Sequence, residues 1–277
     1  QQIQAAEEAG FEFVLVAEHH FSNYGMSPAP LLQALAIAER TKRIKIATAT
    51  LVLPLWQPLR LAEEVAVLDN LTAGRFICGV GRGYQPHEFA RFGVTPQDSR
   101  ARFNECLEVL LKAWTADTSF TYDGEYIKLP NDVVVWPKPY TKPHPPLWVA
   151  CSQLETIELA GRCGIGALGF QFLSAEMAHA WVHAYYNSFT KRQKKLTDYA
   201  SNCNIAMVSY FMCAETDEEA RRRADGVTFF QFSLAWYSGA RNRERAAPGT
   251  VNMWEEYTKW KHENPEAHQR ALRGGLI

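Results

Sequence analysis

The chain lacks an excess of either charge and lacks any long apolar run. Its 277 residues include 29 Lys and Arg and 30 Asp and Glu, which gives a formal net charge of -1. Such a balance gives no electrostatic reason to expect binding to nucleic acid or to an anionic membrane surface. No stretch approaches the roughly 20 apolar residues that cross a bilayer, and the first residues lack a signal-peptide pattern. We therefore expect a cytoplasmic protein whose partner is a small molecule.

Paired cysteines and metal-binding motifs are also missing. The six cysteines are scattered, without a C-x-x-C pair or a histidine at zinc-finger spacing, which favours buried, reduced thiols. The pair His87-Glu88 lacks the second histidine of a zincin helix. The neighbours His19 and His20 point in opposite directions on an extended segment, so they cannot easily bind one metal ion. We expect no metal.

The chain does contain an alternation of short apolar runs with helical spacing. Strands are expected at 14–17, 44–53, 76–80, 146–151, 165–170 and 204–213, and helices at 1–9, 31–40, 59–71, 95–114, 152–162, 175–192 and from 217 onward. Strands that alternate with helices predict a parallel sheet. The chain opens within a helix and stops without a closing strand and helix. We therefore expect an α/β fold, a (β/α)8 TIM barrel that lacks its first strand and its last strand-helix unit. A complete open sheet of six strands is the alternative.

Residues 1–277 are expected to form one such domain with two insertions. The segment 118–146 is rich in aromatic, Gly and Pro residues, which predicts a loop or short hairpin laid over one end of the domain. The segment 239–265 is expected to be a helical or loop insertion.

The first strand ends abruptly in Glu18, His19 and His20. In parallel α/β folds ligands bind beyond the carboxyl ends of the strands, and histidine moves protons readily near neutral pH. A lone histidine is more often a hydrogen-bonded group in a packed loop. The neighbouring Glu18 and the position at a strand end favour chemistry instead.

Two later strand ends suit an anion or a planar ligand. Ser152-Gln153-Leu154-Glu155 reads as a capping box, so the following helix presents free amides at the strand-end crevice, with Thr156 one turn in. Arg82 or Arg100 can supply positive charge, and this set of donors and charges suits one phosphate monoester. The alternative is an ordinary capped helix.

The glycines of Gly79-Val80-Gly81-Arg82-Gly83 either admit a ligand to the backbone or relieve crowding at the barrel rim. Tyr84 stands where a dinucleotide fingerprint needs glycine, so that reading fails. No Gly-x-Ser-x-Gly elbow is present, which disfavours an esterase.

Several motifs in order resemble the bacterial luciferase-like flavin-dependent monooxygenases, from Gln1 to about Glu219. They are Ala17-Glu18-His19-His20-Phe21, Thr48-Ala49-Thr50-Leu51-Val52-Leu53-Pro54, Leu68-Asp69-Asn70-Leu71-Thr72-Ala73-Gly74-Arg75-Phe76, Gly79-Val80-Gly81-Arg82-Gly83 and Asp98-Ser99-Arg100. The resemblance implies an eight-stranded barrel that binds reduced flavin mononucleotide (FMN) at the strand ends, in a chain that looks like a fragment of a full-length member.

Site residues follow from the resemblance. His19 takes the position of the family's active-site histidine, and Glu18 orients the histidine or contacts the flavin ring. Ala49 and Thr50 fall where the family has a non-proline cis peptide. The resemblance implies a cofactor set of Ala49, Thr50, Gly81, Arg82, Arg100, Cys151, Ser152, Gln153 and Thr156. Gly81 replaces a cysteine of luciferase and Ser152 a glutamate, which speaks against light emission.

The implied activity is a monooxygenase that oxygenates a small organic substrate through a flavin hydroperoxide. Reduced FMN would come from a separate reductase, and a homodimer is implied. One alternative is a related branch that transfers hydride with a deazaflavin, and another is a catalytically silent flavin-binding subunit. Trp56, Phe120, Trp148 and Phe170 are candidates for apolar walls, although aromatic residues are often plain core. The sequence does not reveal the substrate.

Overall fold

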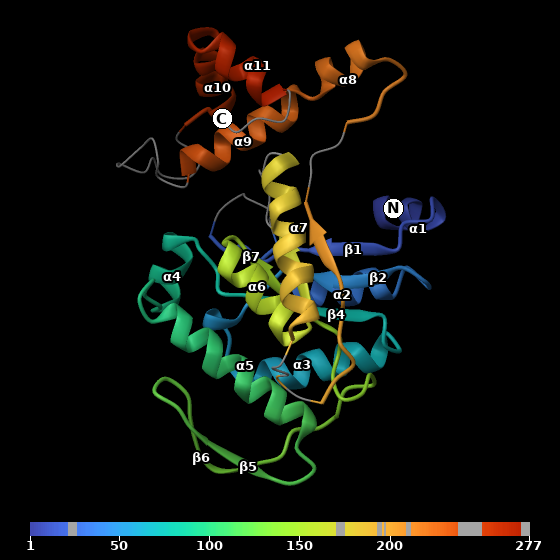
Figure 1. Ribbon diagram of the computed structural model, residues 1–277, viewed down its shortest axis with the longest axis vertical. Coiled ribbons are helices and arrows are strands. Elements are labelled where there is room, and N and C mark those ends of the chain that lie inside the picture. Colours follow the sequence, from blue (N-terminus) through green and yellow to red (C-terminus); the bar gives the residue numbers. More distant parts are fainter. Residues whose placement is uncertain are drawn as a thin grey trace. The chain divides into compact units, whose positions relative to one another are not determined.

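Parallel strands alternate with helices in the computed structural model, which describes residues 1–21, 27–169, 175–192, 196, 198–208, 212–237 and 251–272 (Figure 1). The chain divides into two compact units, residues 1–170 with 181–206, and residues 171–180 with 207–277. The predicted wall residue Phe170 and residues 239–250 of the predicted insertion lie outside the described residues.

The first unit carries a seven-stranded sheet whose strands follow one another in chain order. They are β1 (Phe13–Val16), β2 (Lys45–Thr48), β3 (Leu51–Val52), β4 (Phe76–Gly81), β7 (Leu147–Cys151), β8 (Gly166–Gly169) and β9 (Ile205–Met207). The order is β1-β2-β4-β7-β8-β9, with β3 beside β4, and the pairs from β1 to β8 are parallel. A (β/α)8 barrel is wound in this sequential way. The predicted fold class, a partial barrel of this kind, is confirmed.

Helices cover the sheet between successive strands. They are α1 (Gln2–Glu8), α2 (Pro30–Ala38), α3 (Pro58–Leu71), α4 (Pro86–Phe92), α5 (Ser99–Thr115), α6 (Leu154–Cys163) and α7 (Ala175–Thr190), with a 3-10 turn at Leu53–Leu55. Helix α3 buries Leu61, Val65 and Leu68, a spacing of four and three residues that forms one apolar face. It packs against both α2 and α5.

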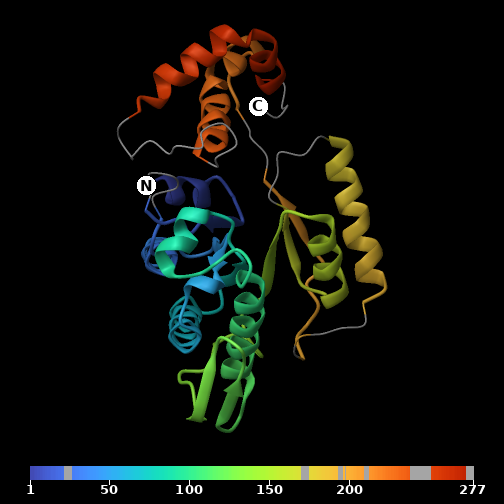
Figure 2. The same cartoon turned by 90° about the vertical axis from the view of Figure 1, so that its left-hand side faces the viewer.

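A hairpin precedes β7, within the predicted insertion at 118–146. Strands β5 (Phe120–Asp123) and β6 (Lys128–Val133) pair antiparallel beside α5 (Figure 2). The carboxylate of Glu105 on α5 accepts the backbone amides of residues 125, 126 and 127 at 2.7, 3.0 and 2.8 Å. A side chain at Gly124 would place its Cβ 2.3 Å from the same carboxylate. The turn of the hairpin is therefore fixed to α5 through its backbone.

The second unit is helical, with α8 (Asp217–Arg223), α9 (Asp225–Tyr237), α10 (Met253–Glu263) and α11 (Pro265–Leu272). Phe232, Tyr257 and Trp260 form its buried cluster. Beside it, the carboxylate of Asp225 receives hydrogen bonds from Tyr257 (2.5 Å), Lys261 (2.8 Å) and His268 (2.8 Å). Burial alone would raise the pKa of Asp225, but these bonds outweigh burial and lower it. One carboxylate thus ties α9 to α10 and α11.

Two sequence predictions need correction. The strand expected at 44–53 is divided into β2 and β3, and the Ala49-Thr50 peptide between them is cis. All six cysteines are free, but Cys203 and Cys213 are exposed, so the prediction of buried thiols holds only for the other four.

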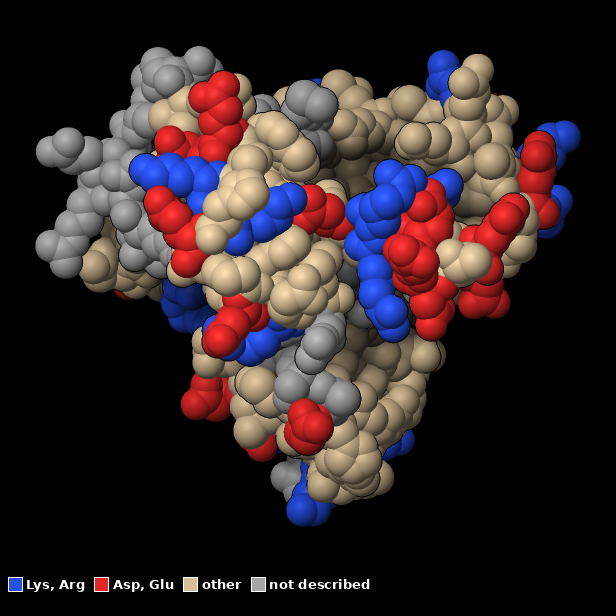
Figure 3. Space-filling model, turned by 90° about the horizontal axis from the view of Figure 1, so that it is seen from above, with Lys and Arg blue, Asp and Glu red and all other residues tan. Residues whose placement is uncertain are grey.

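The surface shows the balance of charges (Figure 3), and the helices show no membrane-spanning pattern among the described residues. On the face in Figure 3, basic and acidic side chains are interspersed. Among the described helices, none combines the length and the hydropathy needed to cross a membrane.

Gly79 is the tightest point of the sheet and gives a stability prediction. The Thr48 hydroxyl bonds to both backbone polar groups of Gly79, at 2.8 and 3.0 Å. An added Cβ would lie 1.9 Å from the Thr48 carbonyl oxygen. We expect Gly79→Ala to lower the free energy of unfolding by about 3 kcal/mol, because backbone must move. Chemical denaturation followed by circular dichroism measures this.

Gly226→Ala is the matched control. Gly226 lies in α9 with nothing within 4 Å of an added Cβ, and alanine favours the helix. It is expected to raise the free energy of unfolding by about 0.5 kcal/mol. Equal effects of the two substitutions would contradict the close approach of β2 and β4.

Candidate active site

The residues that follow β1 form two carboxylate–histidine pairs. His19 Nδ1 lies 3.0 Å from Glu88 Oε1, and the same oxygen accepts the His20 amide at 2.8 Å. His20 Nε2 lies 3.0 Å from Glu18 Oε1. Glu18 and Glu88 are almost fully buried. Each buried carboxylate therefore has a histidine as partner, and the two histidines belong to different pairs.

Glu18 holds His20 rather than His19, which corrects the expectation that it orients the active-site histidine. Its second oxygen accepts the Val52 amide at 2.7 Å, and the indole N–H of Trp56 lies 3.0 Å from both oxygens. Glu18 thus joins the end of β1 to β3 and to the turn that follows it. A buried carboxylate with several donors is held in one orientation.

Electrostatics favour the charged forms of Glu88 and His20. Burial alone would raise the pKa of Glu88, but the hydrogen bonds from His19 and the His20 amide outweigh it, and its pKa is lowered. The hydrogen bond to Glu18 raises the pKa of His20, with a smaller contribution from the nearby charge of Glu88. These shifts favour a carboxylate at Glu88 and a proton on His20.

Local sequence explains how Glu88 reaches β1. Helix α4 begins at Pro86, whose fixed φ suits the first helical position, and ends at Gly93 with φ 68°. Glu88 lies in its first turn, where a negative charge is favourable. Next to it, His87 Nε2 lies 3.1 Å from the His20 carbonyl oxygen. Sequence reasoning considered Glu88 only as a metal ligand. The available signal was an acidic side chain directly before the apolar pair Phe89-Ala90.

Small residues line one face of the sheet at the ends of β4 and β7. Val80 is in register with Val149, so Gly81 and Ala150 follow side by side at the two strand ends, and Ala150 is in register with Leu168. A Cβ at Gly81 would lie 2.3 Å from the Thr50 hydroxyl and 3.4 Å from the Ala150 methyl. Gly81, Thr50 and Ala150 therefore form one tight surface without bulky side chains. The cis Ala49-Thr50 peptide, implied by the family resemblance, borders this surface.

A positively charged region lies just beyond β4. The Arg82 guanidinium donates to the Ser99 hydroxyl at 3.2 Å. Burial lowers the pKa of Arg82, and the nearby charge of Arg100 lowers it further. Two guanidinium groups that repel each other favour an anion between or beside them. The geometry accordingly groups Arg82 with Arg100.

The predicted capping box at Ser152 is wrong. Helix α6 begins at Leu154, its N-cap is Gln153, and no side chain caps it. Ser152 and Gln153 are exposed, and Thr156 is half-buried. Without a capping side chain, the first amides of this ten-residue helix remain available to an external acceptor.

Cys151 does not face the small residues. Because side chains alternate along a strand, Cys151 points to the face opposite Ala150. Its thiol is buried and lies 3.3 Å from the Val149 carbonyl oxygen, and burial raises its pKa to about 12. Only the backbone of Cys151 can therefore serve a ligand at the strand end.

The residues predicted to form apolar walls lie in different parts of the first unit. Trp56 and Trp148 are half-buried, and Trp148 covers Gly166. Phe120 lies on β5 of the separate hairpin, between the end of α5 and the start of β7. It therefore belongs to the end of the sheet where β7 starts, and the candidate site lies where the strands end. Within the described residues, no three His, Cys, Asp or Glu side chains are placed to hold a metal ion.

Comparison with known proteins places these features in context. The family model of the luciferase-like monooxygenases matches residues 1–276. The uncharacterized protein y4vJ of Sinorhizobium fredii is 42% identical over 164 residues, or 59% of this chain and 46% of that protein. The alkanal monooxygenase alpha chain of Photobacterium leiognathi is 36% identical over 238 residues, with 86% and 64% covered. The oxygenase component of the flavin-dependent trigonelline monooxygenase of Acinetobacter baylyi is 27% identical over 241 residues, with 86% and 65% covered.

The chain spans about half the length of several curated relatives. In three of them the match covers 46%, 46% and 44% of the relative's length. Among solved structures, the monooxygenase RslO1 of Streptomyces bottropensis has a TM-score of 0.73 at 26% identity, covering 100% of this chain and 76% of that one.

Two further structures, each 18% identical, share the fold. The oxygenating constituent of 3,6-diketocamphane monooxygenase of Pseudomonas putida, in complex with FMN, has a TM-score of 0.73. The superposition covers 99% of this chain and 72% of that one. An F420-dependent secondary alcohol dehydrogenase has a TM-score of 0.74, and the superposition covers 100% of this chain and 79% of that one.

The His20–Glu18 pair predicts a pH dependence of stability. Because the folded-state pKa of His20 is raised above 6.5, its contribution is fully present below pH 6.5 and is lost as pH rises through the raised value. His20→Gln should therefore cost most below pH 6.5, with a smaller difference from the wild type at alkaline pH. Urea unfolding of both proteins between pH 5.5 and 9 measures this. A difference that grows with pH would contradict a charged pair.

Proposed function

This chain belongs to the luciferase-like monooxygenase family, and from that membership we propose that it is a flavin-dependent monooxygenase. In this proposal it uses reduced FMN and molecular oxygen to oxygenate a small organic substrate. The observation that carries the proposal is the buried His19–Glu88 pair at the same strand ends as the small-residue surface and the paired arginines.

The residues present fit reduced FMN. A planar ring needs a surface without bulky side chains, and Gly81 with Ala150 supplies one that the Thr50 hydroxyl borders. A phosphate monoester needs charge and donors, which Arg82, Arg100 and the uncapped start of α6 supply. We assign Ser152, Gln153 and Thr156 to the phosphate end through their position at that helix start, and Cys151 through its backbone alone.

Bound reduced flavin supplies the activation of molecular oxygen, and the chain supplies proton handling and exclusion of water. We assign the proton to His19. With Nδ1 held by Glu88, the ring has a fixed orientation, and Nε2 is the atom that moves a proton or holds a substrate oxygen. Glu88 is a positioning residue that also stabilises the imidazolium.

The relatives favour a separate source of reduced flavin. The Acinetobacter baylyi relative is named as an oxygenase component, which implies a second component for that protein. By analogy we propose that a flavin reductase supplies reduced FMN to this chain. The F420-dependent dehydrogenase keeps a second candidate open, deazaflavin-dependent hydride transfer, since it has the same fold. A silent flavin-binding subunit is the third candidate, and the buried His19–Glu88 pair argues against it.

Anaerobic titration with reduced FMN and with reduced F420 tests the cofactor. We expect reduced FMN to bind more tightly, and Arg82→Ala to weaken its binding about 10- to 100-fold through loss of a charged hydrogen bond. Arg162→Ala is the matched control, since Arg162 lies in α6 and is paired with Glu158 on the surface. Tighter binding of F420 would favour hydride transfer.

Admission of oxygen then tests the chemistry. Transfer of oxygen-18 from labelled oxygen to a panel of aldehydes, ketones and hydrocarbons identifies monooxygenation. His19→Ala should lower this turnover about 100-fold or more while leaving the binding of reduced FMN within a few-fold. Flavin binding without oxygen transfer to any substrate would favour the silent-subunit reading.

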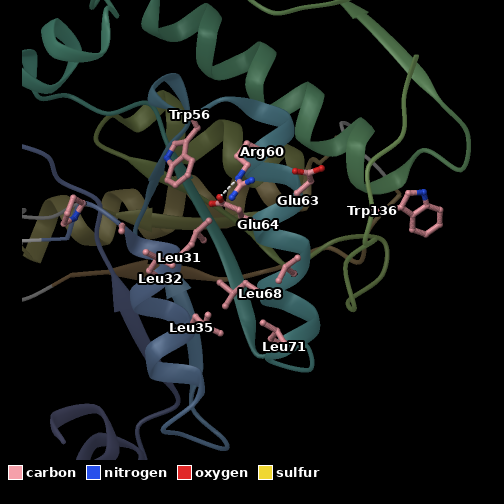
Figure 4. Close-up of a pocket in the computed structure, with 13 residues that line it drawn as sticks. Leu31, Leu32, Leu35, Trp56, Arg60, Glu63, Glu64, Leu68, Leu71 and Trp136 are labelled. Atoms are coloured by element: carbon pink, nitrogen blue, oxygen red, sulfur yellow. Dashed lines mark hydrogen bonds and ion pairs between the residues drawn. The ribbon is translucent and has the colours of Figure 1, made fainter. Parts of the chain in front are cut away.

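We also propose a homodimer formed on the groove between α2 and α3. This cavity of about 690 Å³ follows α3 from Arg60 to Leu71, with Trp56 near Arg60 (Figure 4), and Trp136 also lines it. Leu32, Leu71 and Trp136 are exposed by 69%, 59% and 68%, so the groove offers an apolar surface to a partner.

Charge indicates a second copy as that partner. The wall of α3 carries Arg60 in an ion pair with Glu64 at 2.6 Å, and the exposed Glu63 beside them. A surface with both signs is complementary to itself, which a two-fold symmetric interface requires.

Leu71→Lys tests this interface. A charge in an apolar contact opposes association, whereas lysine at an exposed helix end is compatible with the folded monomer. We expect the dissociation constant of the dimer to rise at least tenfold, measured by sedimentation velocity at several concentrations. Leu159→Lys, an exposed leucine on α6, should leave it unchanged. The interface is elsewhere if both variants dimerise like the wild type.

A further inference from the structure

Trp56 belongs both to the groove between α2 and α3 and to the candidate active site. Its ring lines the groove together with residues of both helices (Figure 4). Its indole N–H lies 3.0 Å from each oxygen of Glu18, which is 3% exposed. One side chain thus has a surface that a partner can touch and a donor inside the site.

The hydrogen bonds of Glu18 continue to the proposed proton carrier. Glu18 also binds the Val52 amide and His20 Nε2. The His20 amide in turn donates to Glu88, which holds His19. The hydrogen bonds on the path from Trp56 to His19 are therefore 2.8 to 3.0 Å long, and they join buried or half-buried groups.

Covering Trp56 changes what this network can do. A half-buried tryptophan on an open groove retains rotamer freedom, and each departure from its rotamer removes a donor from a buried carboxylate. Side chains of a second copy packed on the ring would hold the indole in the rotamer that reaches Glu18. Loss of that packing weakens the fixation of Glu18, and the effect is transmitted to His20.

We propose that Trp56 is a positioning residue that couples occupancy of the α2–α3 groove by a second copy to the hydrogen bonding of Glu18. Dimerisation then completes the candidate active site, although the partner contributes no atom to it. This inference rests on the proposed function, specifically on the homodimer, and identifies the residue through which the dimer acts.

The Val52 amide provides a readout that needs no flavin and no substrate. Its hydrogen exchanges with solvent only when its bond to the Glu18 carboxylate opens. Exchange is measured by NMR in four proteins: the wild type, Leu71→Lys, Trp56→Phe and the double variant. Phenylalanine keeps an aromatic wall in the groove and removes only the indole donor.

Leu71→Lys is expected to speed exchange of the Val52 amide about tenfold, because the monomer no longer holds Trp56 on Glu18. Trp56→Phe is expected to give a similar acceleration in a protein that still dimerises. In the Trp56→Phe background, Leu71→Lys should add less than twofold. Trp136→Phe is the matched control, since it removes an indole N–H from the same groove without a contact to Glu18, and it should leave Val52 unchanged.

The outcomes separate the coupling from the proposals that precede it. A monomeric Leu71→Lys protein whose Val52 amide exchanges like the wild type overturns the coupling and leaves the dimer standing. Equal acceleration by Leu71→Lys with and without Trp56 overturns the role of Trp56. A Leu71→Lys protein that remains dimeric overturns the interface and the coupling together. Binding of reduced FMN, measured separately, stands or fails independently of these results.

Turnover gives a second readout of positioning. Trp56→Phe should lower kcat about tenfold and leave the dissociation constant of reduced FMN unchanged, because Trp56 acts through Glu18 and not on the flavin surface. An equal loss in flavin affinity would overturn a positioning role and indicate a structural one.

Discussion

Two buried carboxylates, those of Glu18 and Glu88, determine how the end of β1 is built. Buried carboxyl groups require hydrogen-bond donors, and the donors found here come from the segment after β1, from β3 and from Trp56. Glu88, which lies on α4, holds the His19 ring and the His20 backbone amide. Glu18 fixes His20, β3 and Trp56. The positions of α4, of the segment after the cis peptide and of both histidines therefore depend on satisfying two buried carboxyl groups.

Sequence periodicity was sufficient for the order of the parallel strands, because each apolar run in this chain ends at a glycine, a proline or a polar cluster. It missed the short helix α4 and began α5 at residue 95 instead of Ser99. It could not divide residues 44–53 into two strands, since Ile46, Leu51 and Val52 are all buried and read as one run. It also placed the start of α6 two residues early. Ser152 has the composition of a capping residue, but its side chain makes no cap in the folded chain. Composition predicts which residues can cap, and backbone geometry decides which one does.

For the candidate site, the sequence located the strand ends but not the pairing of groups across them. Glu18 is adjacent to His19 in sequence, so proximity along the chain suggested that pair. Alternation along the extended segment turns Glu18 and His20 to one side and leaves His19 to Glu88, 69 residues away. Long-range pairs of this kind depend on the approach of α4 to β1. Cys151 illustrates the same limit, because its place at a strand end was evident and its direction followed from register alone.

The bond between Glu105 and the hairpin has an evolutionary consequence. The carboxylate contacts the backbone of residues 125–127, so the side chains of that turn are free to vary without loss of the contact. Gly124 is different, since a side chain there would occupy the space of the Glu105 carboxylate. Positions 105 and 124 are therefore expected to covary among related chains: where a relative carries a larger residue at the second, the first has no reason to remain acidic. Such covariation would trace the history of the hairpin independently of the catalytic residues.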